Sequence, residues 1–158
     1  PNTWADRIYG SAYQGIGVGY YDLGSKEELG NPIAVYVYQG ARIARITQRL
    51  SLNYEWNFGV SFGWKPYDER YNPHNSVIGS KANAYINAGV QLNWMVSRQI
   101  DLIAGVTGTH FSNGNTKFPN AGLNTMGLKV GVVYKTGRCA CQTHILCTCT
   151  EISAPRQL

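Results

Sequence analysis

Residues 50–64 alternate strictly between large apolar side chains and small or polar ones. The odd positions carry only Ser, Asn, Glu and Gly, and the even positions carry Leu50, Leu52, Tyr54, Trp56, Phe58, Val60, Phe62 and Trp64. A period of two predicts a β-strand whose two faces differ in chemistry. The segment is far longer than the usual strand of about 5 or 6 residues.

Two kinds of protein contain such a strand. In a soluble sandwich the large face is the core, whereas in a membrane barrel it meets lipid and the small polar face fills the lumen. Charged residues make up 15% of the 158 residues, against about 25% in an ordinary soluble domain. Gly (18) and Tyr (11) are abundant, and no apolar run approaches the ~18 residues that a spanning helix needs.

Other segments repeat the alternation and favour the membrane barrel. Further strands are predicted at 12–20, 33–46, 82–96, 100–112 and 123–134. Most of them run to ~10 to 15 residues, enough to cross a bilayer at a tilt. Long connections at 22–32, 65–76 and 113–122 alternate with tight turns at 47–49 and 97–99. Long external loops and short periplasmic turns are typical of outer-membrane barrels. We therefore predict an all-β, antiparallel up-and-down outer-membrane β-barrel.

Aromatic residues near strand ends agree with this prediction, because membrane barrels carry aromatic girdles at both interfaces. The residues expected in the girdles are Tyr20, Tyr21, Trp64, Tyr67, Trp94 and Tyr134. Trp56 is expected on the lipid-facing side of its strand.

Six strands are readable in residues 11–135, whereas closure needs about eight. An open edge would leave unpaired backbone groups in hydrocarbon. We expect residues 1–136 to form the barrel, with a missing hairpin before Pro1 and residues 1–10 as its remnant. A partner chain, as in a homodimer, or the tail would be an alternative source.

Residues 137–158 are expected to be an irregular tail, and they contain all four cysteines. The Cys139-x-Cys141 and Cys147-x-Cys149 spacings are not the Cys-x-x-Cys of common zinc sites, so no metal is predicted. The formal net charge is +5. Its densest basic group, Arg42, Arg45 and Arg49, lies around a predicted turn without interleaved exposed aromatics, so no nucleic-acid partner is predicted.

One strand face ends in residues capable of chemistry. The outward set of the strand from residue 100 continues to His110 and Ser112, and Asn124 falls on the same face of the next strand. The three would supply a base, a nucleophile and an orienting group at the level of the outer headgroups. Alternatively, they mark only the exit of the strands into the polar interface.

The segment His110-Phe111-Ser112-Asn113-Gly114, with Pro119 to Asn124 after it, resembles the PagL-like lipid A deacylase (acyloxyacyl hydrolase) family. Tyr-Asp-Leu-Gly at 21–24 and Asn-Pro-Ile-Ala at 31–34 extend the resemblance. It implies an eight-stranded barrel in the bacterial outer membrane that removes an ester-linked acyl chain from lipid A. No metal or other cofactor is implied; the partners would be lipopolysaccharide and membrane lipid.

The resemblance also implies roles for individual residues. Ser112 would be the nucleophile and His110 its general base and later acid, and Asn113 and Gly114 would form the oxyanion hole. Lys117 could contact a lipid A phosphate, although loop lysines are more often only solvated.

Asn124 departs from the family pattern, because it stands where the acidic member of the triad would fall. An amide oxygen can hold the imidazole tautomer, as in Cys-His-Asn proteases, but it cannot stabilise imidazolium by charge. A weakened enzyme is therefore one expectation. The alternative is a non-catalytic structural or adhesive barrel, and a soluble lipocalin-like binder is a third.

Overall fold

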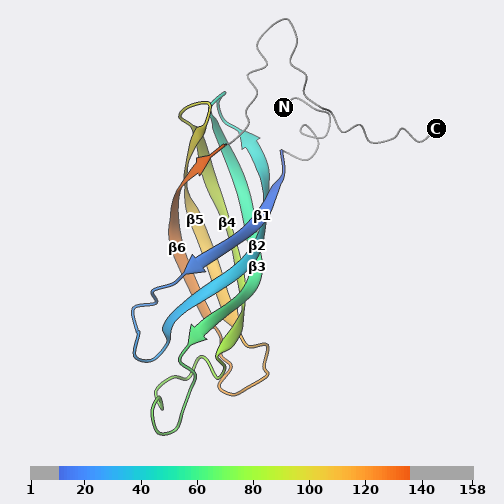
Figure 1. The fold of residues 1–158 in the computed structure, drawn as a ribbon. Coiled ribbons are helices and arrows are strands. Elements are labelled where there is room, and N and C mark those ends of the chain that lie inside the picture. The colour runs from blue at the N-terminus through green and yellow to red at the C-terminus, as the bar shows by residue number, and fades with distance from the viewer. Residues whose placement is uncertain (1–10, 136–158) are drawn as a thin grey trace, which may run out of the picture.

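A computed structural model describes residues 11–135, which form a single six-stranded sheet (Figure 1). Every strand pairs antiparallel with its neighbours in sequence, in the order β1-β2-β3-β4-β5-β6. The strands are β1 (Tyr13–Tyr20), β2 (Gly30–Arg45), β3 (Leu50–Trp64), β4 (Ala82–Met95), β5 (Ile100–Ser112) and β6 (Leu123–Tyr134). No helix among these residues is long and apolar enough to cross a membrane.

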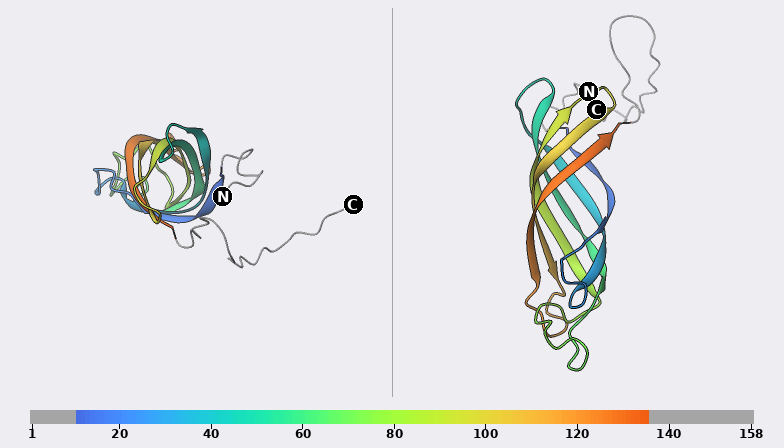
Figure 2. Two further views of the ribbon diagram at one scale, coloured as in Figure 1. Left: turned by 90° about the horizontal axis from the view of Figure 1, so that it is seen from above. Right: turned by 90° about the vertical axis from the view of Figure 1, so that its left-hand side faces the viewer.

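The sheet curls around an axis, as the view along it shows (Figure 2). Within residues 11–135 no pairing joins β1 to β6, so both are edge strands. Leu128 on β6 is 84% exposed, whereas Val106, its cross-strand partner on β5, is 48% exposed. The predicted antiparallel up-and-down fold is confirmed for six strands. The expected remnant at residues 1–10 and the tail at 137–158 lie outside the described residues.

The two faces of the sheet are divided as the alternation predicts. On β3 the outward side chains Tyr54, Trp56, Phe58, Val60 and Phe62 are all exposed. Between them, Asn53, Asn57 and Ser61 are buried on the inner face. The large apolar face therefore points away from the interior, the reverse of a soluble sandwich.

The interior is held by polar contacts. Asn57 Nδ2 donates to Asn87 Oδ1 at 3.2 Å, and Asn87 Nδ2 donates to Thr109 Oγ1 at 2.7 Å. Lys129 Nζ lies 2.5 Å from Glu55 Oε1, which joins β6 to β3 across the lumen. The amide contacts give buried polar side chains on neighbouring strands a partner. The Lys129–Glu55 ion pair links two strands that are not neighbours in the sheet.

Long loops and short turns lie at opposite ends (Figure 1). The loop end comprises residues 21–29, 65–81 and 113–122, and the turn end comprises 46–49 and 96–99. Both turns are fixed by hydroxyls: Leu50 N–H donates to Thr47 Oγ1, and Ile100 N–H donates to Ser97 Oγ, each at 3.0 Å. The predicted alternation of long and short connections is confirmed.

Trp64 is an exception to the predicted faces. It is 4% exposed and points inward, and its Nε1 donates to Ser61 Oγ at 2.9 Å. Gly63 has φ +89°, and the β2–β3 register shifts between Gly30 and Ile33 at the same place. Only glycine adopts this conformation readily, and the irregularity reverses the side of the following residue. The assignment of Trp64 to an outer girdle is therefore wrong.

Trp64 instead joins an aromatic cluster that fills the interior at the loop end, formed by Tyr21, Trp64, Tyr85 and Phe111. The ring centroid of Phe111 lies 4.9 Å from that of Trp64, 5.3 Å from that of Tyr21 and 5.5 Å from that of Tyr85. Tyr21 Oη donates to Tyr85 Oη at 2.6 Å, so the assignment of Tyr21 to an outer girdle is wrong as well. This cluster is the main apolar core, and it anchors the strand ends directly behind the candidate site.

Candidate active site

The last residues of β5 position two candidate side chains on the outer wall. Phe111 is fully buried in the aromatic cluster, so its neighbours His110 and Ser112 project from the opposite face of the strand. Both are partly exposed. The rigid anchor behind them fixes the backbone from which imidazole and hydroxyl extend.

His110 and Asn124 are direct cross-strand partners in the β5–β6 ladder. The Nδ1 of His110 lies 2.7 Å from Oδ1 of Asn124. Because an amide oxygen only accepts, Nδ1 is the donor in this contact, and in the neutral imidazole the lone pair is then on Nε2. The expected approach of His110 and Asn124 on one face is thus found, with the tautomer that a general base needs.

Ser112 lies two residues further along the same face and pairs with Ala84 on β4. Its Oγ accepts a hydrogen bond from Gly114 N–H at 3.1 Å. The hydrogen bonds of residues 11–135 do not include one between Ser112 and His110. Rotation about the Cα–Cβ bond is what would turn the hydroxyl toward the imidazole.

The two residues expected in an oxyanion hole differ in their surroundings. The side chain of Asn113 is buried: its Nδ2 donates to Lys117 O at 2.5 Å, and its Oδ1 accepts from Asn115 N–H at 3.1 Å. That amide holds the shape of the loop. Gly114, at φ +62°, directs its N–H at Ser112 Oγ. The Gly114 N–H therefore contacts the candidate nucleophile, whereas the side-chain amide of Asn113 is engaged within the loop.

Lys117 is held by its backbone, while its side chain is exposed at the loop end. Its carbonyl accepts a hydrogen bond from the Asn113 side-chain amide. The ammonium group lies in the same loop, five residues after Ser112 in the sequence, and forms no hydrogen bond with Ser112 among residues 11–135. A lysine so placed can meet a phosphate at the membrane surface.

Gly122 was not predicted as a functional residue. It has φ +71°, and a Cβ there would lie 3.1 Å from His110 Cε1 and from Phe111 O. Its N–H donates to Val77 O at 3.3 Å, which ties loop 113–122 to loop 65–81. The absence of a side chain lets the chain lie against the imidazole edge. The one feature of the sequence that could have indicated this role is that Gly122 stands two residues before Asn124.

The wall next to His110 is unusually bare. Gly108 lies on the outward face and pairs with Ala88 and Met126. The nearest atom to a Cβ built on it would be Ala88 O, at 4.0 Å. Glycine in a strand interior lowers stability, and here no packing contact requires it. Gly108 and Ala88 therefore form a bare strip of the outer wall beside His110, flanked by the exposed side chain of Met126.

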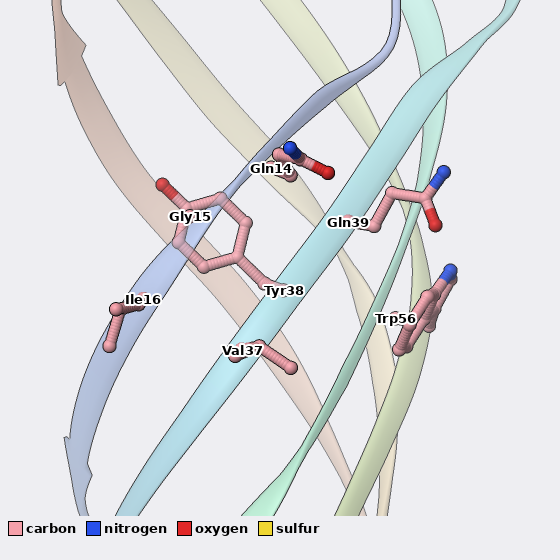
Figure 3. A pocket seen from close by; sticks show the side chains of 7 residues that line it. All are labelled: Gln14, Gly15, Ile16, Val37, Tyr38, Gln39 and Trp56. Carbon is pink, nitrogen blue, oxygen red and sulfur yellow. The ribbon is translucent and has the colours of Figure 1, made fainter.

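A separate hollow lies on the opposite part of the sheet (Figure 3). It has a volume of about 310 Å³, and its lining comes from β1, β2 and β3. Gln14 and Gln39, which are cross-strand partners, meet Trp56 there. None of the candidate-site residues lines this hollow, so it does not belong to the candidate site.

The outward apolar wall, polar lumen and antiparallel up-and-down order define the class of small outer-membrane-type β-barrels. The family model for lipid A 3-O-deacylase (PagL) matches residues 3–133, and the chain belongs to this family. Comparison with curated proteins and with solved structures gave no match. The resemblance stated from the sequence is thereby confirmed.

Proposed function

We propose that this protein is an outer-membrane esterase that hydrolyses an ester-linked acyl chain of lipid A, with Ser112 as nucleophile and His110 as general base. The observation that carries the proposal is the 2.7 Å contact between His110 Nδ1 and Asn124 Oδ1 on the outer wall. It leaves Nε2 unprotonated on the face that Ser112 shares. Membership of the lipid A 3-O-deacylase family supports the substrate class.

The reaction would proceed by acyl transfer to serine and then to water. Ser112 Oγ attacks the ester carbonyl carbon while its proton passes to His110 Nε2. The Gly114 N–H stabilises the developing oxyanion. His110 then protonates the departing sugar hydroxyl oxygen, and the acyl group stays on Ser112. Water, deprotonated by His110, releases the fatty acid and regenerates the serine.

The position of these residues on the outer wall supports a lipid substrate. Acyl chains of lipid A in the membrane already lie against such a wall, so binding is lateral and requires no deep cavity. The bare strip around Gly108 would receive the chain to be cleaved, and Lys117 would meet a phosphate of the headgroup. We propose the outer membrane as the location, with lipopolysaccharide as the partner.

The test is to express the full chain in a Gram-negative host and analyse lipid A by mass spectrometry. Loss of one acyl chain is expected in the wild type and not in Ser112→Ala. Ser76→Ala, an exposed serine in another loop at the same end, is the matched control and should retain activity. Unchanged lipid A from folded wild-type protein would contradict the proposal.

A non-catalytic barrel is the second candidate, and the uncharged Asn124 favours it. Without a carboxylate, imidazolium receives no charge stabilisation, and residual turnover then depends on positioning alone. The same experiment separates the two, because an inactive relative leaves lipid A intact in wild type and variants alike.

A further inference from the structure

The charges of residues 11–135 are divided unequally between the two ends of the barrel. At the loop end they balance, with five acidic and five basic residues: Asp22, Glu27, Glu28, Asp68 and Glu69 against Lys26, Lys65, Arg70, Lys81 and Lys117. At the turn end five basic residues face one acidic residue: Arg42, Arg45, Arg49, Arg98 and Lys135 against Asp101. In between, Glu55 and Lys129 neutralise each other in the lumen.

The exposed charge at the turn end is entirely positive among the described residues. Asp101, its one carboxylate, is 2% exposed and forms an ion pair with Lys135. Arg45, Arg49 and Arg98 are all exposed. The excess of positive charge in the described barrel is therefore presented on this rim.

Arg49 and Arg98 lie in two turns that are joined to each other, and Arg45 ends β2, where it pairs with Ser51. Met95 N–H donates to Arg49 O at 2.7 Å, which ties the turn at 46–49 to the strand end that leads into Arg98. Exposed apolar side chains adjoin them on the outer wall, namely Ile43, Ile46, Val96 and Ile100. The three arginines therefore stand where the apolar strands end and the polar turns begin.

We propose that Arg45, Arg49 and Arg98 form an interfacial binding site for anionic phospholipid headgroups of the leaflet at the turn end. Guanidinium binds phosphate oxygens with paired, charge-assisted hydrogen bonds. Because arginine side chains are long and flexible, their charged heads can reach the headgroups from the rim. Basic residues beside a membrane-embedded surface attract anionic lipid in this way. The site is independent of deacylation, which the proposed function assigns to the other end.

The test measures lipid retention by the full-length protein refolded in detergent micelles. Native mass spectrometry compares bound phosphatidylglycerol with phosphatidylcholine of the same acyl chains. The Arg45→Gln/Arg49→Gln/Arg98→Gln variant is compared with Lys26→Gln/Arg70→Gln/Lys81→Gln, which removes equal charge from exposed positions at the loop end. We expect the wild type to prefer phosphatidylglycerol, the turn-end variant to lose about tenfold in its retention, and the loop-end variant to keep it.

Folding of each variant is checked by its heat-modifiable migration on gels. If the triple variant does not fold, Arg49→Gln and Arg98→Gln are measured singly, and each should lose part of the preference. The proposal would be overturned if both triple variants lost phosphatidylglycerol retention equally, or if the wild type retained the two lipids equally. Displacement of the lipid by inorganic phosphate alone would also overturn it, by indicating a site for free anions.

Discussion

His110 on β5 and Asn124 on β6 face each other directly in the ladder, and their Nδ1 and Oδ1 atoms are 2.7 Å apart. A triad carboxylate both orients the imidazole and stabilises imidazolium by its charge; Asn124 can orient the imidazole but carries no charge. Separating these two contributions experimentally is straightforward, because Asp has the same shape as Asn.

Asn124→Asp should accelerate deacylation by about tenfold or more. A carboxylate oxygen in place of Oδ1 would keep the Nδ1–H tautomer and stabilise the imidazolium that forms during attack, and tenfold corresponds to about 1.4 kcal/mol. The rate of acyl loss from lipid A, followed by mass spectrometry, measures this. Asn124→Ala should be slower than the wild type. An Asn124→Asp protein that folds but is no faster would show that charge is not limiting.

Gly122→Ala should reduce kcat more than it changes KM. The new Cβ would lie 3.1 Å from His110 Cε1, so the imidazole must shift away from its alignment. Gly24→Ala is the matched control: Gly24 has φ +76° and nothing within 4 Å of its Cβ position. Both variants carry similar backbone strain of about 1 kcal/mol. Equal activity in the two would refute a positioning role for Gly122.

Gly108→Leu should slow cleavage of long acyl chains while leaving folding intact. The added side chain would enter open space on the outer wall and occupy the strip that leads to His110. Ala104→Leu, on the same face six residues from His110, or about 20 Å along the strand, is the control. Comparison of kcat/KM on long and short acyl substrates measures the effect. If both variants slow cleavage equally, the acyl chain of the substrate does not bind along the strip at Gly108.

Lys129→Met should destabilise the barrel by about 2 kcal/mol. It leaves Glu55 in the lumen without its cation, where the carboxylate side chain is only 14% exposed, although the partial exposure of Lys129 limits the loss. The exposed Lys65–Glu27 pair offers the comparison, and Lys65→Met should cost less than about 1 kcal/mol. Urea unfolding in micelles gives both values. Glu55→Gln combined with Lys129→Met should recover part of the loss; no recovery would argue against direct coupling.

The strands and their outward faces followed from the period-two pattern because a lipid-facing wall and a polar lumen impose opposite chemistry on alternate residues. Trp64 did not follow it. A glycine gives no sign in the sequence of whether it takes a positive φ, so the reversal at Gly63 was not predictable from alternation. The same limit applies to Gly122, whose role depends on where the His110 ring lies.

The candidate site was predictable in part. Parity along β5 and β6 places His110, Ser112 and Asn124 on one face, and the register brings His110 opposite Asn124. The role of Asn113 was not predictable, because its side-chain amide donates a hydrogen bond to Lys117 O, four residues later in an irregular loop. Loop hydrogen bonds depend on the folded path of the chain, which periodicity does not encode.

The sequence by itself determined that this chain has a strand wall with one apolar and one polar face, and it identified the few polar residues on the apolar face. The tertiary structure decided which of those residues touch and which aromatic rings turn inward. It also showed that the excess of exposed positive charge gathers at the turn end. The physical reason is that face chemistry repeats locally along each strand, whereas register, bulges and loop packing arise only from contacts between distant segments.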